Sequence, residues 1–210
     1  MKELKSTNQS SDILRQVDDF FMNTGPVHQT LRNIAKRLSQ TNIDYVVIGG
    51  MALALHGLIR PTQDVDLLLT AGGLKEFQTR LVGLGYAPAY PGARKHFRDT
   101  DTGVKVDITT TGEYPGDGLA SAIAFPDPAE VAVILEGFKV VRLESLIELK
   151  LASGKSARHR ELRDLADVQQ LIETLRLPED FSRNLDESVR KEYQRLWELA
   201  QLARGDDSVE

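Results

Sequence analysis

Residues 44–69 decide the fold, and they read DYVVIGGMALALHGLIRPTQDVDLLL. The short, continuous apolar run at 44–48 is rich in β-branched residues, which predicts a strand buried on both faces. Gly49–Gly50 follow, and then residues 51–56 have a high helix propensity. Residues 64–69 predict a second strand. The stretch therefore predicts strand, glycine turn, helix and strand, which begins a mixed α/β arrangement.

Apolar periodicity on both sides of this stretch predicts the remaining elements. Helices are predicted near residues 12–22, 26–38, 74–84, 143–153 and 159–176, with a last helix after Pro178. Strands are predicted at 95–98, 104–109, 131–135 and 138–141, with a long Gly- and Pro-rich loop at 111–129. We expect an α/β (α+β) fold: a short, mixed, twisted sheet with helices on one face. The predicted division is N-terminal helices 1–42, α/β core 43–142, C-terminal helical region 143–204 and disordered tail 205–210.

Composition excludes several classes of protein. The chain has 210 residues, a net charge of −5 and no cysteine. Disulfides, zinc–thiolate sites, iron–sulfur clusters and a cysteine nucleophile are thereby excluded. An acidic chain is not a general nucleic-acid coat, so a polyanion would need a local basic patch or metal ions. The polar start and the lack of an apolar run of about 20 residues predict a cytoplasmic protein without a membrane span.

Three carboxylates are the leading candidates for chemistry. Asp64 and Asp66 are two residues apart on a predicted strand, so their side chains share a face and their Cα atoms lie about 6.6 Å apart. Asp107 lies among apolar residues of a later strand, where an unpaired charge is expensive to bury. Together they could bind one or two divalent cations, and oxygen ligands suit Mg²⁺. The alternatives are a solvated Asp-x-Asp pair and an Asp107 satisfied by Lys105 or Arg98.

The glycine turn is the second candidate feature. Gly49 and Gly50 separate a buried strand from a helix start. Such a turn lets backbone N–H groups approach a phosphate closely. A tight strand-to-helix turn without a ligand is the alternative.

These motifs resemble those of a known superfamily. Ile48-Gly-Gly50, Asp64-Val-Asp66-Leu67 and Val106-Asp107-Ile108 are similar to the signature of the DNA polymerase β-type nucleotidyltransferases. The stretches ALALHG (52–57), RPTQDVD (60–66), LESLIELK (143–150) and RDLADV (163–168) resemble the AbiEii-type nucleotidyltransferase-like proteins. That branch includes toxins of toxin–antitoxin systems. The resemblance covers roughly residues 43–175.

The resemblance implies a role for each matching residue. Gly49 and Gly50 would hold the phosphates of a nucleoside triphosphate, and Asp64, Asp66 and Asp107 would form the catalytic two-metal Mg²⁺ site. Arg60 and Thr62 precede the Asp pair, so both are expected near the mouth of the nucleotide site, although Arg60 could instead pair with an acid. Lys150 would reach the triphosphate, or would lie at a seam between domains. Asp164 and Asp167 are expected to form ion pairs with Arg163, Lys150 or Arg160, and His56 a structural hydrogen bond.

The function implied is a Mg²⁺-dependent transfer of a nucleoside monophosphate from a nucleoside triphosphate to an acceptor hydroxyl. The acceptor is left open among RNA (such as tRNA), a protein and a small molecule. The basic run at 155–163 could meet RNA or be a solvated helix start. A cognate antitoxin is another implied partner, and the N-terminal helices are a candidate homodimer surface. The alternative is a non-catalytic nucleotide- or partner-binding module of a toxin–antitoxin pair.

Overall fold

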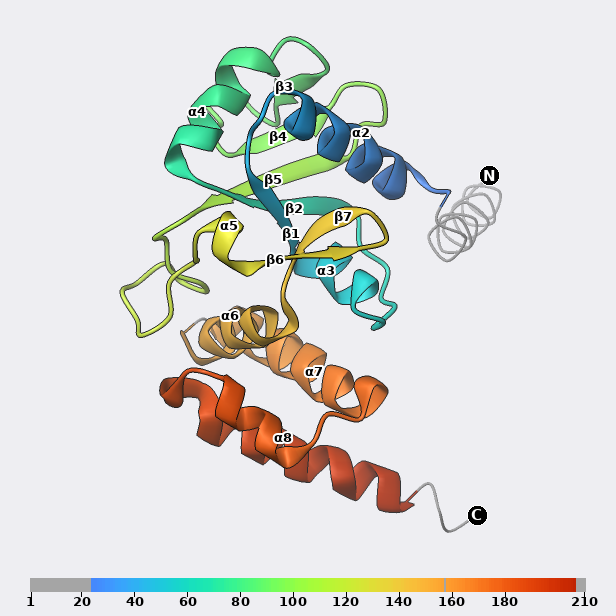
Figure 1. Ribbon diagram of the computed structural model, residues 1–210, viewed down its shortest axis with the longest axis vertical. Helices are drawn as coiled ribbons and strands as arrows, with labels where there is room; N and C mark the ends of the chain where they lie inside the picture. Colours follow the sequence, from blue (N-terminus) through green and yellow to red (C-terminus); the bar gives the residue numbers. More distant parts are fainter. Residues whose placement is uncertain (1–23, 157, 207–210) are drawn as a thin grey trace, which may run out of the picture.

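A computed structural model describes residues 24–156 and 158–206. Its centre is a mixed seven-stranded sheet with the order β3-β4-β5-β2-β1-β7-β6 (Figure 1). The strands are β1 (Tyr45–Ile48), β2 (Asp64–Leu69), β3 (Tyr86–Pro88), β4 (His96–Asp99), β5 (Lys105–Thr110), β6 (Ala132–Leu135) and β7 (Phe138–Val141).

Helices lie around the sheet and beyond one end of it (Figure 1). They are α2 (Pro26–Gln40), α3 (Gly49–Leu55), α4 (Ala71–Arg80), α5 (Pro128–Val131), α6 (Leu143–Ser156), α7 (Arg158–Leu175), the 3₁₀ helix η1 (Glu179–Asn184) and α8 (Glu187–Asp206). The last three α-helices stack on one another, α6 against α7 and α7 against α8. None of the helices among the described residues combines the length and apolarity that crossing a membrane requires.

The register of the central strands positions the acids. β2 lies between β1, which is antiparallel to it, and β5, which is parallel. Asp66 is opposite Ile48 on one side and Asp107 on the other. Because side chains alternate along a strand, Val65 and Leu67 point away from this row, and both are fully buried. Burial of these alternate side chains in the core therefore fixes which face of the sheet carries the acids.

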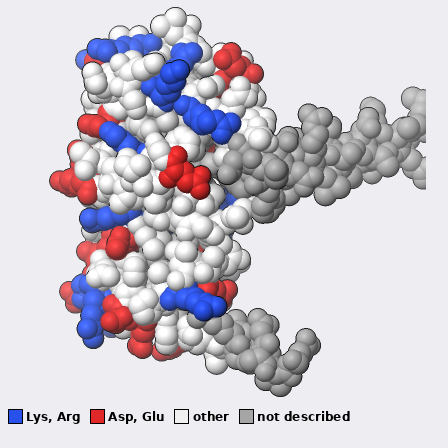
Figure 2. Space-filling view, turned by 45° about the vertical axis from the view of Figure 1, so that its right-hand side comes forward, with Lys and Arg blue, Asp and Glu red and all other residues white. Residues whose placement is uncertain are grey.

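Most predicted elements are confirmed. The strand at 64–69 has the predicted bounds, and the other predicted strands begin and end within one residue of the prediction. The mixed sheet with flanking helices is also confirmed. Figure 2 shows acidic and basic side chains interspersed on one face, in keeping with the small net charge. The predicted helix near 12–22 lies outside the described residues.

Four local predictions are wrong. The helix predicted at 74–84 runs from Ala71 to Arg80, because the Thr70 hydroxyl caps it by accepting the Gly73 N–H. Strand β3 was not predicted. Helix α5 begins inside the predicted loop and takes residue 131 from the predicted strand. Helix α8 continues to Asp206, beyond the predicted start of the tail, and residues 207–210 lie outside the described ones.

Candidate active site

Asp64 and Asp66 on β2 and Asp107 on β5 come together as expected. One carboxylate oxygen from each lies within 4.8 Å of the others, and all three residues are partly buried. We call these three residues the acid cluster. Adjacent parallel strands in register bring the second and third acids side by side, and the two-residue spacing on β2 adds the first.

The electrostatics of the acid cluster disfavour a full set of charges. Burial raises the pKa of Asp66 to about 7, and the negative charges of Asp64 and Asp107 add to the rise. Lys150 and the backbone N–H of Gly50 act in the opposite direction without cancelling it. A divalent cation would remove the repulsion, so the cluster has the charge and the oxygen donors that Mg²⁺ favours.

The glycine turn packs directly onto these acids. Gly49 has φ +64°, and a Cβ there would lie 2.0 Å from Oδ2 of Asp66. A Cβ at Gly50 would lie 2.7 Å from the Thr62 hydroxyl, which itself donates to Asp64 Oδ1 at 2.6 Å. A side chain at either glycine would collide with Asp66 or with Thr62. The turn therefore needs both glycines to pack this closely against the acid cluster, and a strand-to-helix turn alone would not require that contact.

Asp107 has a partner that the sequence analysis missed. Nδ1 of His96 on β4 lies 2.9 Å from Asp107 Oδ1, and the two residues are opposite one another in the register. Among the described residues, neither Lys105 nor Arg98 forms the ion pair with Asp107 that was considered. The predicted strands at 95–98 and 104–109 contained the signal, since pairing them across the short segment between them places a β4 residue beside the acid.

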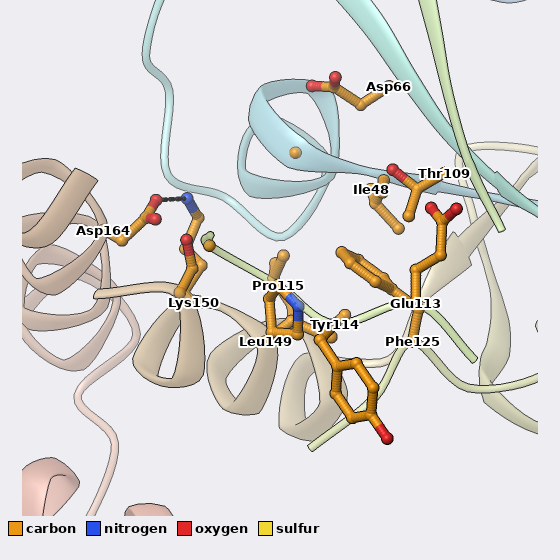
Figure 3. A pocket seen from close by; sticks show the side chains of 14 residues that line it. Ile48, Asp66, Thr109, Glu113, Tyr114, Pro115, Phe125, Leu149, Lys150 and Asp164 are labelled. Atoms are coloured by element: carbon orange, nitrogen blue, oxygen red, sulfur yellow. Dashed lines mark hydrogen bonds and ion pairs between the residues drawn. The ribbon is translucent and has the colours of Figure 1, made fainter. Parts of the chain in front are cut away.

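A cavity of about 290 Å³ opens beside Asp66. Its walls come from the sheet, from α6 and from the segment between β5 and α5 (Figure 3). Figure 3 shows Asp66, Thr109 and Glu113 at one side and Lys150 with Asp164 at the other. The lining residues that sequence reasoning missed include Thr109, Glu113, Tyr114, Pro115, Phe125 and Ser153. Four of these six lie in the segment predicted only as a long loop, which offers no periodicity to interpret.

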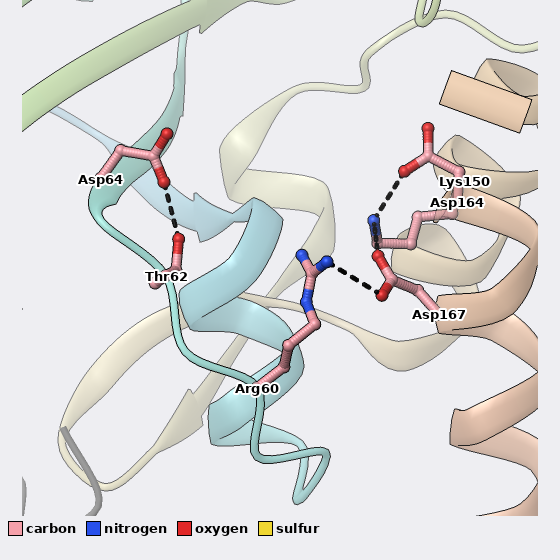
Figure 4. Close-up of polar contacts among 6 residues, drawn as sticks. All are labelled: Arg60, Thr62, Asp64, Lys150, Asp164 and Asp167. Carbon is pink, nitrogen blue, oxygen red and sulfur yellow. Dashed lines mark hydrogen bonds and ion pairs between the residues drawn. The ribbon is translucent and has the colours of Figure 1, made fainter. Parts of the chain in front are cut away.

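Lys150 lines this cavity but is held by two acids. Its Nζ lies 2.9 Å from Asp164 Oδ1 and 2.6 Å from Asp167 Oδ2. Arg60 Nη1 lies 3.4 Å from Asp167 Oδ1. We call these four residues the ion-pair cluster, and Figure 4 shows it apart from the contact between Thr62 and Asp64. The expectation that Asp164 and Asp167 form ion pairs is confirmed, and so is the alternative in which Arg60 pairs with an acid.

His56 is the remaining candidate that the sequence singled out. Its Nε2 lies 2.8 Å from the backbone oxygen of Val141, at the end of β7. The expected structural hydrogen bond is therefore confirmed. Of the basic run, Lys155 donates to the backbone oxygen of Ser188. The side chains of residues 157–161 lie outside the described ones.

Comparison with known proteins gives one decisive match. A family model described as "Uncharacterised nucleotidyltransferase" matches residues 6–203. Among curated proteins, none matches the chain.

Solved structures with a similar fold have low sequence identity. A Thermotoga maritima protein assigned to the nucleotidyltransferases is 22% identical, covers 66% of this chain and 91% of its own, and has a TM-score of 0.48. A nucleotidyltransferase-like protein from Paracoccidioides brasiliensis is 19% identical over 69% and 74%, with a TM-score of 0.44. The antibiotic-resistance factor ANT(2'')-Ia is 13% identical over 85% and 95%, with a TM-score of 0.47. At these values the likeness concerns the fold and says nothing of this chain's activity.

Proposed function

The chain belongs to the uncharacterised nucleotidyltransferase family, and on that premise we propose that it transfers a nucleoside monophosphate from a nucleoside triphosphate to an acceptor hydroxyl. The observation that carries the proposal is the acid cluster packed against the Gly49–Gly50 turn. Three adjacent carboxylates repel one another and thereby destabilise the fold. A purely structural role would not explain why the chain places them together.

Asp64, Asp66 and Asp107 would hold the divalent cations, with Mg²⁺ as the ion that suits an all-oxygen donor set. Bound there, the ions would neutralise charge on the phosphates and on the reacting oxygens. The chain's own residues orient the donors. Thr62 donates to Asp64, and His96 contacts Asp107, so one oxygen of each carboxylate is already held in place.

The nucleotide would occupy the cavity between the acid cluster and α6. Gly49 and Gly50 would present backbone to the phosphates at close range. Lys150 would add a positive charge, since an ammonium has three N–H donors and its hydrogen bond to Asp164 uses one of them, while Asp167 is an ion-pair partner. Arg60 lies beside the same acids, and its buried Nε has no hydrogen-bond partner among the described residues.

The proposed step is an in-line displacement at the α-phosphorus. The acceptor oxygen forms a new O–P bond while the bond between the α-phosphorus and the bridging oxygen breaks, and pyrophosphate leaves. The hydroxyl proton passes to the Asp107 carboxylate and from there to solvent.

A labelling experiment tests this proposal. The protein is incubated with Mg²⁺ and each α-labelled triphosphate in the presence of RNA, protein and small-molecule acceptors. We expect label transfer by the wild-type protein and none by Asp64→Ala or Asp66→Ala. Equal yields from all three proteins would contradict the assignment. Nucleotide binding without transfer would instead support the non-catalytic binding module.

The finer predictions go with this proposal. They are the dependence on Mg²⁺, the use of ATP, the AbiEii-type subgroup, a cognate antitoxin, a homodimer and a cytoplasmic location. The division into an α/β core at 43–142 and a helical region from 143 is likewise proposed. Co-purification of a small protein encoded beside the gene is the measurement that would support the antitoxin.

A further inference from the structure

The open face of the sheet continues past the acid cluster toward β4. Side chains on this face form two rows across the strands. One row runs through Ile48, Asp66, Asp107 and His96, and the next runs through Asp64, Lys105 and Arg98. The glycine turn follows Ile48 directly, so it lies at the β1 end of the first row. The β4 end of both rows is the opposite side of the acids.

In-line displacement requires the acceptor and the pyrophosphate to lie on opposite sides of the acid cluster. The attacking oxygen and the leaving pyrophosphate lie on opposite sides of the phosphorus. If the phosphates lie at the Gly49–Gly50 turn, the acceptor must approach from the side of β5 and β4. The surface there is exposed at His96, Arg98 and Lys105, and these residues do not line the cavity that we assign to the nucleotide.

That surface carries two cations and an aromatic platform. Arg98 and Lys105 are exposed, and among residues 24–156 and 158–206 neither has an acidic group within 4.0 Å. Tyr90 is 55% exposed and stacks on His96, with ring centroids 6.0 Å apart and an interplanar angle of 28°. Arg98 Nη1 donates a hydrogen bond to the backbone oxygen of Gly103, which leaves its positive charge without a carboxylate partner. Proteins that bind single-stranded nucleic acids combine an exposed aromatic ring with such cations, because bases stack and phosphates need positive charge.

We infer that Tyr90, His96, Arg98 and Lys105 form the acceptor site, and that the acceptor is the 3′-terminal hydroxyl of a single-stranded nucleic acid. The terminal base stacks on Tyr90, and the preceding phosphates lie along Arg98 and Lys105. His96 contacts both Tyr90 and Asp107, so it links the stacked base to the carboxylate that receives the hydroxyl proton. The inference rests on the proposed function, since it names the acceptor for that same site.

Binding of a fluorescent single-stranded RNA or DNA oligonucleotide, followed by anisotropy, tests the inference. We expect Tyr90→Ala to weaken binding about ten-fold or more, and Tyr90→Phe to retain it, because stacking needs only the ring. We expect the double change Arg98→Ala with Lys105→Ala to reduce the salt dependence of log K by a slope of about 1.4, the value for two single-strand phosphate contacts.

A matched control removes one exposed charge elsewhere. Lys191→Ala on α8, at the far end of the molecule from β4, should bind the oligonucleotide as the wild-type protein does. All four altered side chains are exposed, so each variant should keep the wild-type melting temperature. Equal weakening by the control and by the double change would overturn the assigned surface.

A separate measurement distinguishes failure of this inference from failure of the proposed function. Binding of a non-hydrolysable triphosphate with Mg²⁺, followed by calorimetry, reports the nucleotide site alone. The Tyr90 and Arg98 with Lys105 variants should bind it as the wild type does. If the triphosphate binds but no oligonucleotide does, or if label moves only to a protein or a small molecule, the nucleic-acid acceptor is wrong and the transferase proposal stands. If the triphosphate does not bind, both proposals are overturned.

Discussion

The acid cluster and the ion-pair cluster both contain aspartates but differ in charge balance. In the acid cluster three aspartates lie together, and none of the described cationic side chains pairs with all three. In the ion-pair cluster two aspartates are matched by Lys150 and Arg60. The fold balances the negative charge of the ion-pair cluster with its own cations, but it leaves the three carboxylates of the acid cluster repelling one another. Only the acid cluster therefore requires a bound cation for its charge to be stable.

The largest expected effect is the loss of activity when the acid cluster is changed. Asp66→Asn keeps the shape of the side chain but removes a ligand charge, so transfer should fall by at least about 100-fold. Asp44→Asn, which changes an exposed acid paired with Lys139, should leave transfer unchanged. The labelling assay with pyrophosphate detection measures both. A fully active Asp66→Asn protein would break the distinction between the clusters.

The second prediction concerns how much the buried ion-pair cluster contributes to the stability of the fold. Lys150→Met leaves Asp164 and Asp167 buried with less positive charge, so the free energy of unfolding should fall by about 3 kcal/mol. The matched control is Lys139→Met, in a solvent-exposed pair, where the loss should be about 1 kcal/mol or less. Urea unfolding measures both. Equal losses would show that burial does not distinguish the two pairs.

The third prediction concerns the turn that faces the acid cluster. Gly49→Ala places a Cβ against Asp66, whereas Gly83→Ala meets nothing within 4 Å, and both positions have positive φ. The backbone cost is therefore shared, and the difference reports the contact with the acid. We expect Gly49→Ala to be less stable than Gly83→Ala by about 2 kcal/mol. Similar unfolding free energies would mean that the turn can move away from Asp66.

The fourth prediction is a pH dependence of stability without metal. The pKa of Asp66 is about 7 in the folded chain and about 3.9 when unfolded, so the folded state binds more protons between these values. The free energy of unfolding should therefore decrease as pH rises from 4 to 7, by at most about 4 kcal/mol, the full linkage of a shift of about three pKa units.

Asp66→Asn provides the control for this titration. It should lack the decrease and be more stable than the wild-type protein at pH 8. Saturating Mg²⁺ should restore the free energy of unfolding of the wild-type protein at pH 8, but it should not increase that of the variant. Parallel pH profiles for the two proteins would mean that Asp66 does not carry the repulsion.

Much of the fold could be predicted because its signals are local. The alternation at Asp64–Leu69 fixed both the strand and the face of its acids, and the glycine pair marked the strand-to-helix turn. The apparent helix at 74–84 was misjudged, since Leu81 and Leu84 kept a helical spacing while Gly83 and Gly85 adopt positive φ. Two such glycines end a helix whatever the apolar pattern suggests.

The candidate site also contains residues that the sequence predicts and residues that only the structure reveals. Three acids with strand spacing could be found from the sequence, and so could Lys150 as a candidate partner of Asp164 and Asp167. The partner of Asp107 could not be found, because it comes from another strand. His96 reaches Asp107 through hairpin register, and Glu113 and Phe125 reach the cavity through a segment without periodicity. Contacts of this kind are set by tertiary packing, which a single chain's local pattern does not encode.

Binding of Mn²⁺, a spectroscopic substitute for Mg²⁺, tests the central claim most directly. Electron paramagnetic resonance of free Mn²⁺ is measured during titration of the wild-type, Asp66→Asn, Asp107→Asn and Asp167→Asn proteins. The account predicts that the wild-type and Asp167→Asn proteins bind the ion, and that the two acid-cluster variants bind it at least about ten-fold more weakly. Equal affinity in all four proteins would contradict the assignment of the acid cluster as a metal site.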